Sequence, residues 1–356
     1  MTEREHIHTL SLLLLRPSQA PDVVRQLASA SENDRAELLD LAATHHVLIR
    51  AFSPLAQAAE SMNEPMLTEW AKQAINKEQA EIDNSLRYLN DICQSLEQHG
   101  CPTTVIKSLD HTPDLGNDLD LYTTCNERPV IEVFTKKFNA KIEDRSWGDR
   151  LAGKWNFVIP GLNKTIEMHT KRLGQTGEHT DLARRFVSRR MTKTVGGFTF
   201  YIPAAEERIV AATLQRMYRH FYFRLCDIVN TAHMVESGEV NFAELRNATR
   251  PAGIWPGVAT FLNIVSDYVK EYRGTRLELP AEVKSAAVFG GNKLAVKKRF
   301  LRLPIMPESA QLYGYQMVTT AAKGDYNAAF RLSLLPPLAS AAKIAVRLIG
   351  TEKAVW

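Results

Sequence analysis

The chain of 356 residues is 45% hydrophobic and 24% charged, and its formal net charge is +4. These values are ordinary for a folded globular protein, and they exclude a chain that is disordered over most of its length. The length accommodates one large domain or two to three smaller ones, and the mildly basic balance is compatible with a phosphate-bearing partner.

The cysteines and the two ends of the chain bear on its compartment. No two of the four cysteines form a Cys-x-x-Cys pair, so we expect reduced thiols, without a disulfide framework or a zinc site. The apolar run at residues 10–15 is too short to span a bilayer, and we expect a cytoplasmic protein. The apolar and basic tail, residues 334–356, is expected to dock on the body as a helix, and the alternative is contact with a membrane surface.

Residues 1–99 are predicted to form an N-terminal helical region. Apolar residues recur at helical spacings in residues 10–15, 20–30 and 35–58. The clearest helix covers residues 66–98 and is expected to end at His99-Gly100. Its apolar residues step by four, three, four and three positions and form one stripe: Ile82, Leu86, Leu89, Cys93 and Leu96.

Residues 100–202 are predicted to form a small mixed α/β core. Short β-prone segments occur at residues 103–106, 118–123, 155–159 and 164–169, and residues 198–202 are a further candidate strand. A helix is expected at residues 129–138, where Val130, Val133, Phe134 and Phe138 share one side.

Helices return in the C-terminal region, residues 203–356. A long helix is predicted from residue 204 to about residue 235, and shorter helices at residues 242–250, 255–272 and 280–289. The basic stretch at residues 293–302 leads to a final helical part and is expected to be solvated, with a membrane-surface role as the alternative. The expected fold class is therefore α+β, a small mixed sheet flanked by N-terminal and C-terminal helical regions.

An acidic pair in the second predicted strand is the most informative feature of the sequence. Asp118 and Asp120 alternate with Leu119 and Leu121, so the carboxylates share one strand face, roughly 6–7 Å apart at Cα, and the leucines share the other. Paired carboxylates beside a phosphate-sized turn are suited to binding Mg²⁺ together with a nucleoside triphosphate. The alternative interpretation of the pair is a solvated strand end.

A third carboxylate is expected from the strand at residues 164–169. Ile166 and Met168 are predicted to face the core, so Glu167 and His169 share the polar face. Glu167 is the candidate third metal ligand, with a surface strand residue as the alternative. For His169 three roles remain open, which are orienting a phosphate, acting as a base, or capping a sheet edge.

The order of these parts resembles a poorly characterised bacterial nucleotidyltransferase family of the polymerase-β-like superfamily. The family has a Leu-Lys-Gly-like stretch, a variable loop, an Asp-Ile-Asp-Leu-Leu-like strand and a later Asp-Leu-His-like strand. The similar segments here, over residues 35 to 235, include those of the flanking helices: Ala43-Thr44-His45-His46-Val47, Ile106-Lys107-Ser108, Asp118-Leu119-Asp120-Leu121, Ile166-Glu167-Met168-His169 and Arg224-Leu225-Cys226-Asp227-Ile228.

The resemblance implies a nucleotidyltransferase core and a magnesium-dependent transferase that uses a nucleoside triphosphate, with ATP the expected one and two Mg²⁺ ions. It implies Asp118, Asp120 and Glu167 as catalytic metal ligands and Ser108 near the phosphates. The superfamily pattern has Gly-Ser or Gly-Gly at the turn where this chain has Lys107-Ser108, and a side chain there limits how closely the backbone approaches a phosphate. Lys107 supplies a mobile positive charge for the triphosphate, or is solvated.

A charged stripe is expected on the long helix at residues 204–235. Arg216, His220, Arg224 and Asp227 follow near-helical spacing, with Arg219 adjacent, and such a stripe can bind a triphosphate or RNA. Arg216 and His220 are the candidate nucleotide-binding residues. The alternative is a solvated helix face with internal ion pairs, worth about 0.2–0.5 kcal/mol each.

Three functions are consistent with the sequence. The first is transfer of a nucleoside monophosphate to an acceptor, with release of pyrophosphate; the acceptor is a small molecule, a peptide, a protein or an RNA. The second is a non-catalytic binding module that holds RNA, a protein or a lipid surface through basic faces. The third is a kinase-like phosphotransferase, which would release a nucleoside diphosphate.

Overall fold

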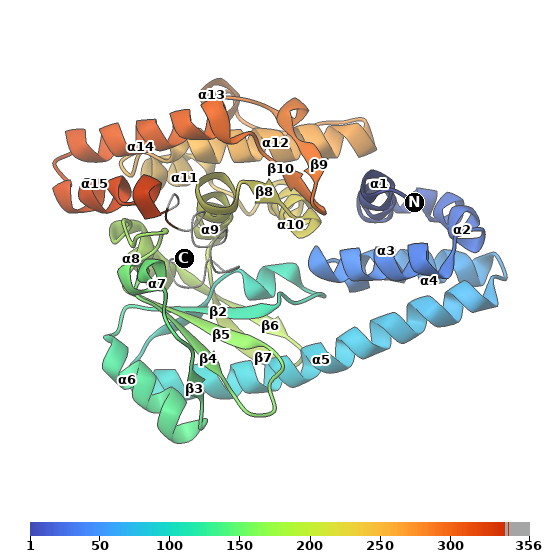
Figure 1. The fold of residues 1–356 in the computed structure, drawn as a ribbon, viewed down its shortest axis with the longest axis horizontal. Helices are drawn as coiled ribbons and strands as arrows, with labels where there is room; N and C mark the ends of the chain where they lie inside the picture. The colour runs from blue at the N-terminus through green and yellow to red at the C-terminus, as the bar shows by residue number, and fades with distance from the viewer. Residues whose placement is uncertain (339–340, 342–356) are drawn as a thin grey trace.

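The computed structural model describes residues 1–338 and 341, and their fold is α+β, as predicted (Figure 1). A sheet lies between α5 and α6 on one side and the C-terminal helices on the other. Most of the predicted tail helix, residues 334–356, lies outside the described residues. Among the described residues, no helix is long and apolar enough to cross a membrane.

The N-terminal helical region is confirmed. It comprises α1 (Glu3–Leu15), α2 (Ala20–Ala28), α3 (Glu32–Thr44), α4 (Leu48–Ser61) and α5 (Pro65–Gln98). A capping box of Thr2 and Glu5 begins α1, and the predicted end of α5 is confirmed, because Gly100 follows with a φ of +71°.

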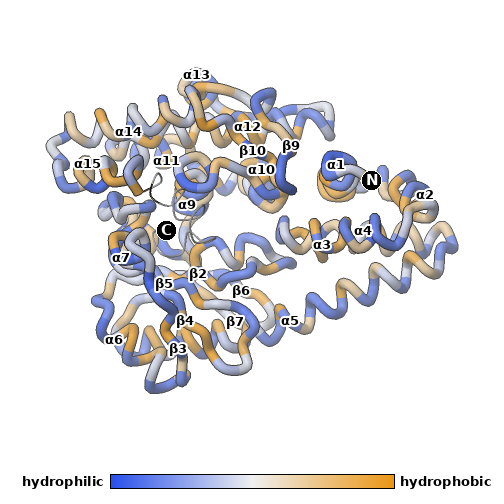
Figure 2. Tube along the Cα trace, in the orientation of Figure 1, coloured by the Kyte–Doolittle hydropathy of each residue, from blue (hydrophilic) through white to orange (hydrophobic). Residues whose placement is uncertain are grey.

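The stripe predicted for α5 is largely buried, since only Cys93 of its five members is half-exposed. Figure 2 shows hydrophilic and hydrophobic segments alternating along this helix, as a helix with one apolar face requires.

Five strands form the sheet that carries the acidic residues. They are β1 (Thr103–Val105), β2 (Asp118–Thr123), β3 (Lys141–Ile142), β4 (Lys154–Val158) and β5 (Thr165–Thr170), in the spatial order β1-β2-β5-β4-β3. Only β2 and β5 are parallel, so their connection crosses over through α6 (Glu127–Glu132), β3, α7 (Trp147–Ala152) and β4. The predicted alternation is confirmed, because Leu119, Leu121, Ile166 and Met168 are all fully buried.

Two parts of the core region differ from the prediction. The candidate strand at residues 198–202 exists as β7 (Phe198–Pro203), but it pairs with β6 (Arg190–Val195) in a separate hairpin that turns at Gly196-Gly197. Four elements of this region were not predicted: β3, β6, α7 and α8 (Asp181–Ser188). The predicted helix at residues 129–138 is confirmed as α6, which continues in a π-helical turn, Val133–Lys137.

The predicted long helix at residues 204–235 is wrong. The chain forms α9 (Ala205–Gln215), a π-helical turn (Arg216–His220), the short strand β8 (Tyr222–Phe223) and α10 (Leu225–Glu236). Phe221 has a φ of +54°, which no α-helix accommodates. The fully buried Arg216 forms an ion pair with Asp227 (Nε to Oδ2, 2.7 Å), which connects the segment before this break to α10.

The remaining helices follow the prediction with shifted ends. They are α11 (Phe242–Thr249), α12 (Trp255–Arg273), α13 (Ala281–Ala286), α14 (Ala310–Ala322) and α15 (Tyr326–Ser333). The basic stretch at residues 293–302 contains a hairpin of β9 (Ala295–Lys297) and β10 (Phe300–Arg302), and β10 also pairs with β8.

Gly153, which ends α7, is expected to be sensitive to any side chain. Its φ is +66°, and a Cβ atom would lie 2.7 Å from the backbone oxygen of Thr170 on β5. We expect Gly153→Ala to lower the free energy of unfolding by about 2–4 kcal/mol, because strain and overlap add. Gly100→Ala is the matched control, since the φ of Gly100 is similar but its added Cβ atom would meet no neighbouring atom within 4 Å. This substitution should lower the free energy of unfolding by only about 1 kcal/mol. Urea denaturation measures both, and equal losses would contradict the overlap argument.

Candidate functional site

The register of β2 against β5 brings the acidic residues together. Asp120 lies directly opposite Glu167, and Asp118 lies opposite Thr165. All three carboxylates belong to the face that is not packed into the apolar core, since the alternating residues are the buried leucines, isoleucine and methionine. As predicted, Asp118, Asp120 and Glu167 line one cavity.

Two lysines approach these carboxylates. Lys107 Nζ lies 2.5 Å from Asp120 Oδ1, and Lys154 Nζ lies 2.6 Å from Glu167 Oε2. Lys154 also faces Asp149 at 3.6 Å, and His169 Nε2 lies 2.7 Å from Glu167 Oε1. Both oxygens of Glu167 therefore have a partner.

Burial and the neighbouring charges shift the pKa values of these side chains in different directions. It raises the pKa of Asp120 to about 7, although the Lys107 ammonium opposes the shift. Burial also acts on Glu167, but the Lys154 ion pair and the hydrogen bond with His169 outweigh it and hold the pKa of Glu167 well below its usual range. Burial lowers the pKa of His169, although the hydrogen bond that its Nε2 donates to Glu167 opposes the shift.

A divalent cation has suitable ligands at this position. One side-chain atom each of Asp120, Glu167 and His169 lies within 4.8 Å of the others. The carboxylate oxygens of Asp120 and Glu167 suit Mg²⁺ or Mn²⁺, and Asp118 lines the same cavity as a further oxygen donor. His169 belongs to this group of side chains through its hydrogen bond to Glu167.

The carboxylates line a cavity of about 260 Å³ whose opposite wall is basic. That wall is formed by the segment that runs from the end of α9 through the π-helical turn and β8 to the residue before α10. Lining residues from it are Gln215, Arg216, Arg219, His220, Tyr222 and Arg224. The carboxylates and the predicted nucleotide-binding residues Lys107, Arg216 and His220 therefore surround one space.

Several nitrogens of the basic wall lack acceptors. Arg216 Nη1 and Arg224 Nε are buried without a hydrogen-bond partner among the described residues. Arg219 has no ion pair or hydrogen bond within the described part of the chain. Unsatisfied buried donors are costly, and an anion in the cavity would satisfy them. The arrangement thus fits a ligand with several negatively charged oxygens.

His220 and Arg216 reach the cavity for a different reason than predicted. Spacing on a continuous helix would have aligned them, but the break at Phe221 folds β8 and Arg224 back beside them. Burial lowers the pKa of His220 to about 2, so this imidazole is neutral beside the arginines.

Ser108 does not occupy the place that was predicted for it. Its hydroxyl accepts a hydrogen bond from the backbone N–H of Asp120 (2.8 Å) and lies 3.3 Å from the backbone oxygen of Asp118. The residue is buried and does not line the cavity. Ser108 therefore positions the acidic strand, and its hydroxyl is not free for a phosphate.

Sequence reasoning missed Lys154 and gave little weight to Arg219 and His46, which also line the cavity. Lys154 contacts Glu167 because β4 pairs with β5 in the register Lys154 opposite His169 and Asn156 opposite Glu167. No local pattern marks such a pairing. His46 lies in the break between α3 and α4, where its Nε2 accepts a hydrogen bond from Arg224 Nη1 (2.6 Å).

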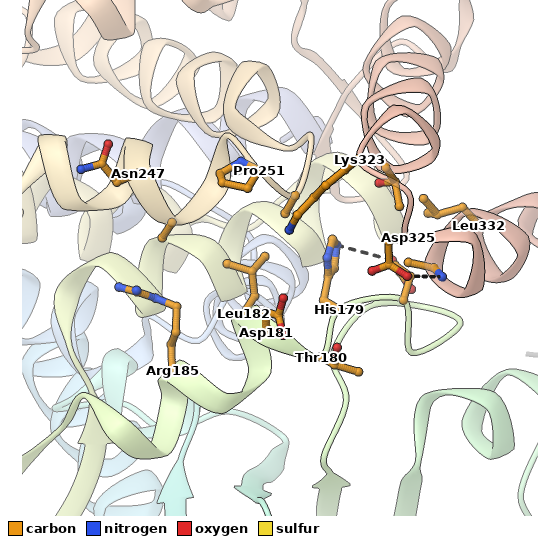
Figure 3. Close-up of a pocket in the computed structure, with 15 residues that line it drawn as sticks. His179, Thr180, Asp181, Leu182, Arg185, Asn247, Pro251, Lys323, Asp325 and Leu332 are labelled. Carbon is orange, nitrogen blue, oxygen red and sulfur yellow. Dashed lines mark hydrogen bonds and ion pairs between the residues drawn. The ribbon is translucent and has the colours of Figure 1, made fainter.

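A second cavity, of about 370 Å³, lies among α8, α11, α14 and α15 (Figure 3). Figure 3 shows His179, Lys323 and Asp325 around it, with Leu182 and Pro251 at its apolar side. None of the predicted site residues lines this cavity. The predicted carboxylates, Arg216 and His220 line the smaller, basic-walled cavity instead.

Comparisons of this chain with protein-family models, with curated proteins and with solved structures find no match.

Proposed function

We propose that the five-stranded sheet is a nucleotidyltransferase core of the polymerase-β-like superfamily and that this protein transfers a nucleoside monophosphate from a triphosphate to an acceptor. The observation that carries the proposal is the parallel register of β2 and β5, which places Asp120 opposite Glu167 beside a cavity with a basic far wall. This arrangement combines ligands for Mg²⁺ with cations for phosphate in one space.

Each side chain has a specific task in this proposal. Asp118 and Asp120 would hold the divalent metal beside Glu167, whose carboxylate His169 orients through its 2.7 Å hydrogen bond. When bound, Mg²⁺ neutralises the triphosphate charge and polarises the α-phosphate. Arg219 and Arg224 bind the phosphate oxygens, and Arg216 stiffens the wall through its ion pair with Asp227.

The reaction is a substitution at the α-phosphorus. An acceptor hydroxyl, amine or phosphate oxygen forms a bond to this phosphorus, the bond to the bridging β-phosphate oxygen breaks, and pyrophosphate leaves with that electron pair. The acceptor's proton passes to a base or to solvent. Alignment and charge neutralisation supply most of the rate enhancement for such a step.

Arg219→Met tests the phosphate-binding wall. Arg219 has no partner among the described residues, so its removal should leave the fold intact. We expect ATP affinity in the presence of Mg²⁺ to fall about 10- to 100-fold, the loss of a charge-assisted hydrogen bond of about 1.5–3 kcal/mol. Isothermal calorimetry measures the affinity. Arg184→Met, an exposed arginine on α8 that does not line the cavity, is the matched control and should change nothing.

The products distinguish the proposal from a phosphotransferase. Incubation with α-labelled and γ-labelled ATP should release labelled pyrophosphate from the γ label and leave the α label on the acceptor. Release of a nucleoside diphosphate would instead assign a kinase-like reaction.

A non-catalytic module is the second candidate, and one observation favours it. Lys107 and Lys154 already neutralise Asp120 and Glu167, as expected of a scaffold that needs no metal. Salt-sensitive RNA binding that Asp120→Asn leaves unchanged, without Mg²⁺-dependent ATP binding, would support this module.

A further inference from the structure

The metal-binding carboxylates differ in how much of their coordination capacity is already used. Asp120 Oδ1 forms an ion pair with the Lys107 ammonium. One oxygen of Glu167 forms an ion pair with Lys154, and the other accepts a hydrogen bond from His169. The Asp118 side chain is exposed and has no hydrogen bond or ion pair among residues 1–338 and 341. The ligands that remain open are therefore Asp118 and the second oxygen of Asp120.

The backbone holds Lys107 in this position. On one side, the Ile106 N–H donates to the backbone oxygen of Asp120 (2.9 Å). On the other, the Ser108 hydroxyl accepts from the Asp120 N–H (2.8 Å). Lys107 is thus clamped between two residues that both bond the main chain of its carboxylate partner.

The conformation of Lys107 is one that glycine adopts without strain. Its φ is +68° and its ψ is −52°, a combination that costs about 1 kcal/mol or more for a residue with a side chain. Lys154 is equally constrained, because it is buried between Glu167 and Asp149. Two fixed ammonium groups therefore lie where carboxylates of this kind would otherwise share a second divalent cation.

We propose that the Lys107 ammonium takes the place of one of the two metal ions, so that this protein binds a single divalent cation, on Asp118 and Asp120. The proposal rests on the proposed function, which supplies the nucleotide that completes the coordination. A bound ammonium supplies one fixed positive charge where a divalent ion supplies two, and it leaves the cluster less positive. It differs from the expectation of two Mg²⁺ ions.

Counting bound Mn²⁺ tests the proposal without an activity assay. The full chain is dialysed against Mn²⁺ with a non-hydrolysable ATP analogue, and the bound ions are counted by electron paramagnetic resonance. We expect one Mn²⁺ per wild-type chain and two per Lys107→Gly chain, with the spin–spin broadening of two nearby ions. Glycine is the chosen replacement because the position has a positive φ.

Two further variants keep the test decisive. Lys107→Met removes the charge but keeps a long side chain, and it should also bind two ions if Lys107→Gly does not fold. Lys193→Met is the matched control, since Lys193 Nζ donates to the Leu109 backbone oxygen (2.7 Å) in the same segment and contacts no metal-binding carboxylate. It should bind one ion.

The outcomes separate this inference from the proposed function. Two ions per wild-type chain, or one ion in both Lys107 variants, would overturn the single-ion proposal while leaving nucleotidyl transfer intact. If no bound Mn²⁺ is sensitive to Asp118→Asn, the metal site itself is absent, and the proposed function fails with the inference.

Discussion

Asp120→Asn is expected to abolish nucleotide chemistry and leave the protein folded. Asp120 is the one carboxylate that contacts Lys107, lies opposite Glu167 and belongs to the metal-ligand group. An amide cannot replace its charge, so we expect pyrophosphate release from ATP to fall by about 10³-fold or more, equivalent to about 4 kcal/mol of lost transition-state stabilisation.

The stability of this variant has a definite pH dependence. The folded-state pKa of Asp120 is about 7, above its ordinary value of 3.8, so the contribution of this group to the free energy of unfolding falls as the pH rises through that interval. The Asn variant lacks this loss, since an amide does not titrate. Relative to wild type, its free energy of unfolding should therefore be higher at pH 8 than at pH 5, as measured by urea denaturation.

Asp144→Asn is the control for both readouts. Asp144 is exposed in the segment between β3 and α7 and does not line the cavity. Its substitution should alter neither pyrophosphate release nor the pH profile of stability. Near-wild-type pyrophosphate release by the Asp120 variant would refute the assignment of the site.

Two buried histidines are expected to destabilise the folded protein as the pH falls below 6.5. His45 is fully buried in a neutral form, because Nε2 donates to the Arg299 backbone oxygen (2.8 Å) and Nδ1 accepts from the Leu225 N–H (2.8 Å). A second proton on Nδ1 would break the Leu225 bond. Burial, opposed in part by the bond to Arg299, lowers the pKa of His45 to about 4.

The neighbouring His46 behaves in the same way. Its Nε2 accepts from the Arg224 guanidinium, so a proton there would place two cations in contact. Burial and this arginine hold the pKa of His46 well below its usual range. Both histidines take up a proton near pH 6.5 in the unfolded chain but not in the folded one, so their contribution to the free energy of unfolding falls as the pH drops below 6.5.

For His45 alone the loss is about 2 kcal/mol between pH 7.5 and pH 5. Urea denaturation at a series of pH values measures the slope. His45→Gln should be less stable at neutral pH but should show a smaller pH slope, whereas His8→Gln, an exposed histidine on α1, should keep the wild-type slope. Identical slopes in the wild type and His45→Gln would contradict a neutral buried imidazole.

The two histidines also connect the helical region to the cavity. His45 links α3 to the backbone before α10 and to Arg299, and His46 bonds the Arg224 guanidinium that lines the basic wall. Loss of these bonds in acid should therefore disturb the phosphate-binding wall together with the N-terminal helices.

Local patterns in the sequence determined the elements whose residues interact within a few positions. The stripe of α5, the alternation of Asp118 to Leu121 and that of Ile166 to His169 are periodic, and periodicity reports directly which face is buried. Alternation also placed the three carboxylates on polar strand faces, while the resemblance implied their role as metal ligands.

Only the tertiary structure decided what surrounds the carboxylates. The β4–β5 register brings Lys154 to Glu167, a positive φ aims Lys107 at Asp120, and the break at Phe221 folds Arg224 beside Arg216. The break brings Arg216 and Asp227 into a buried ion pair that a continuous helix would have separated. Such pairings join residues distant along the chain, and their free energies depend on burial and register, which no local periodicity encodes.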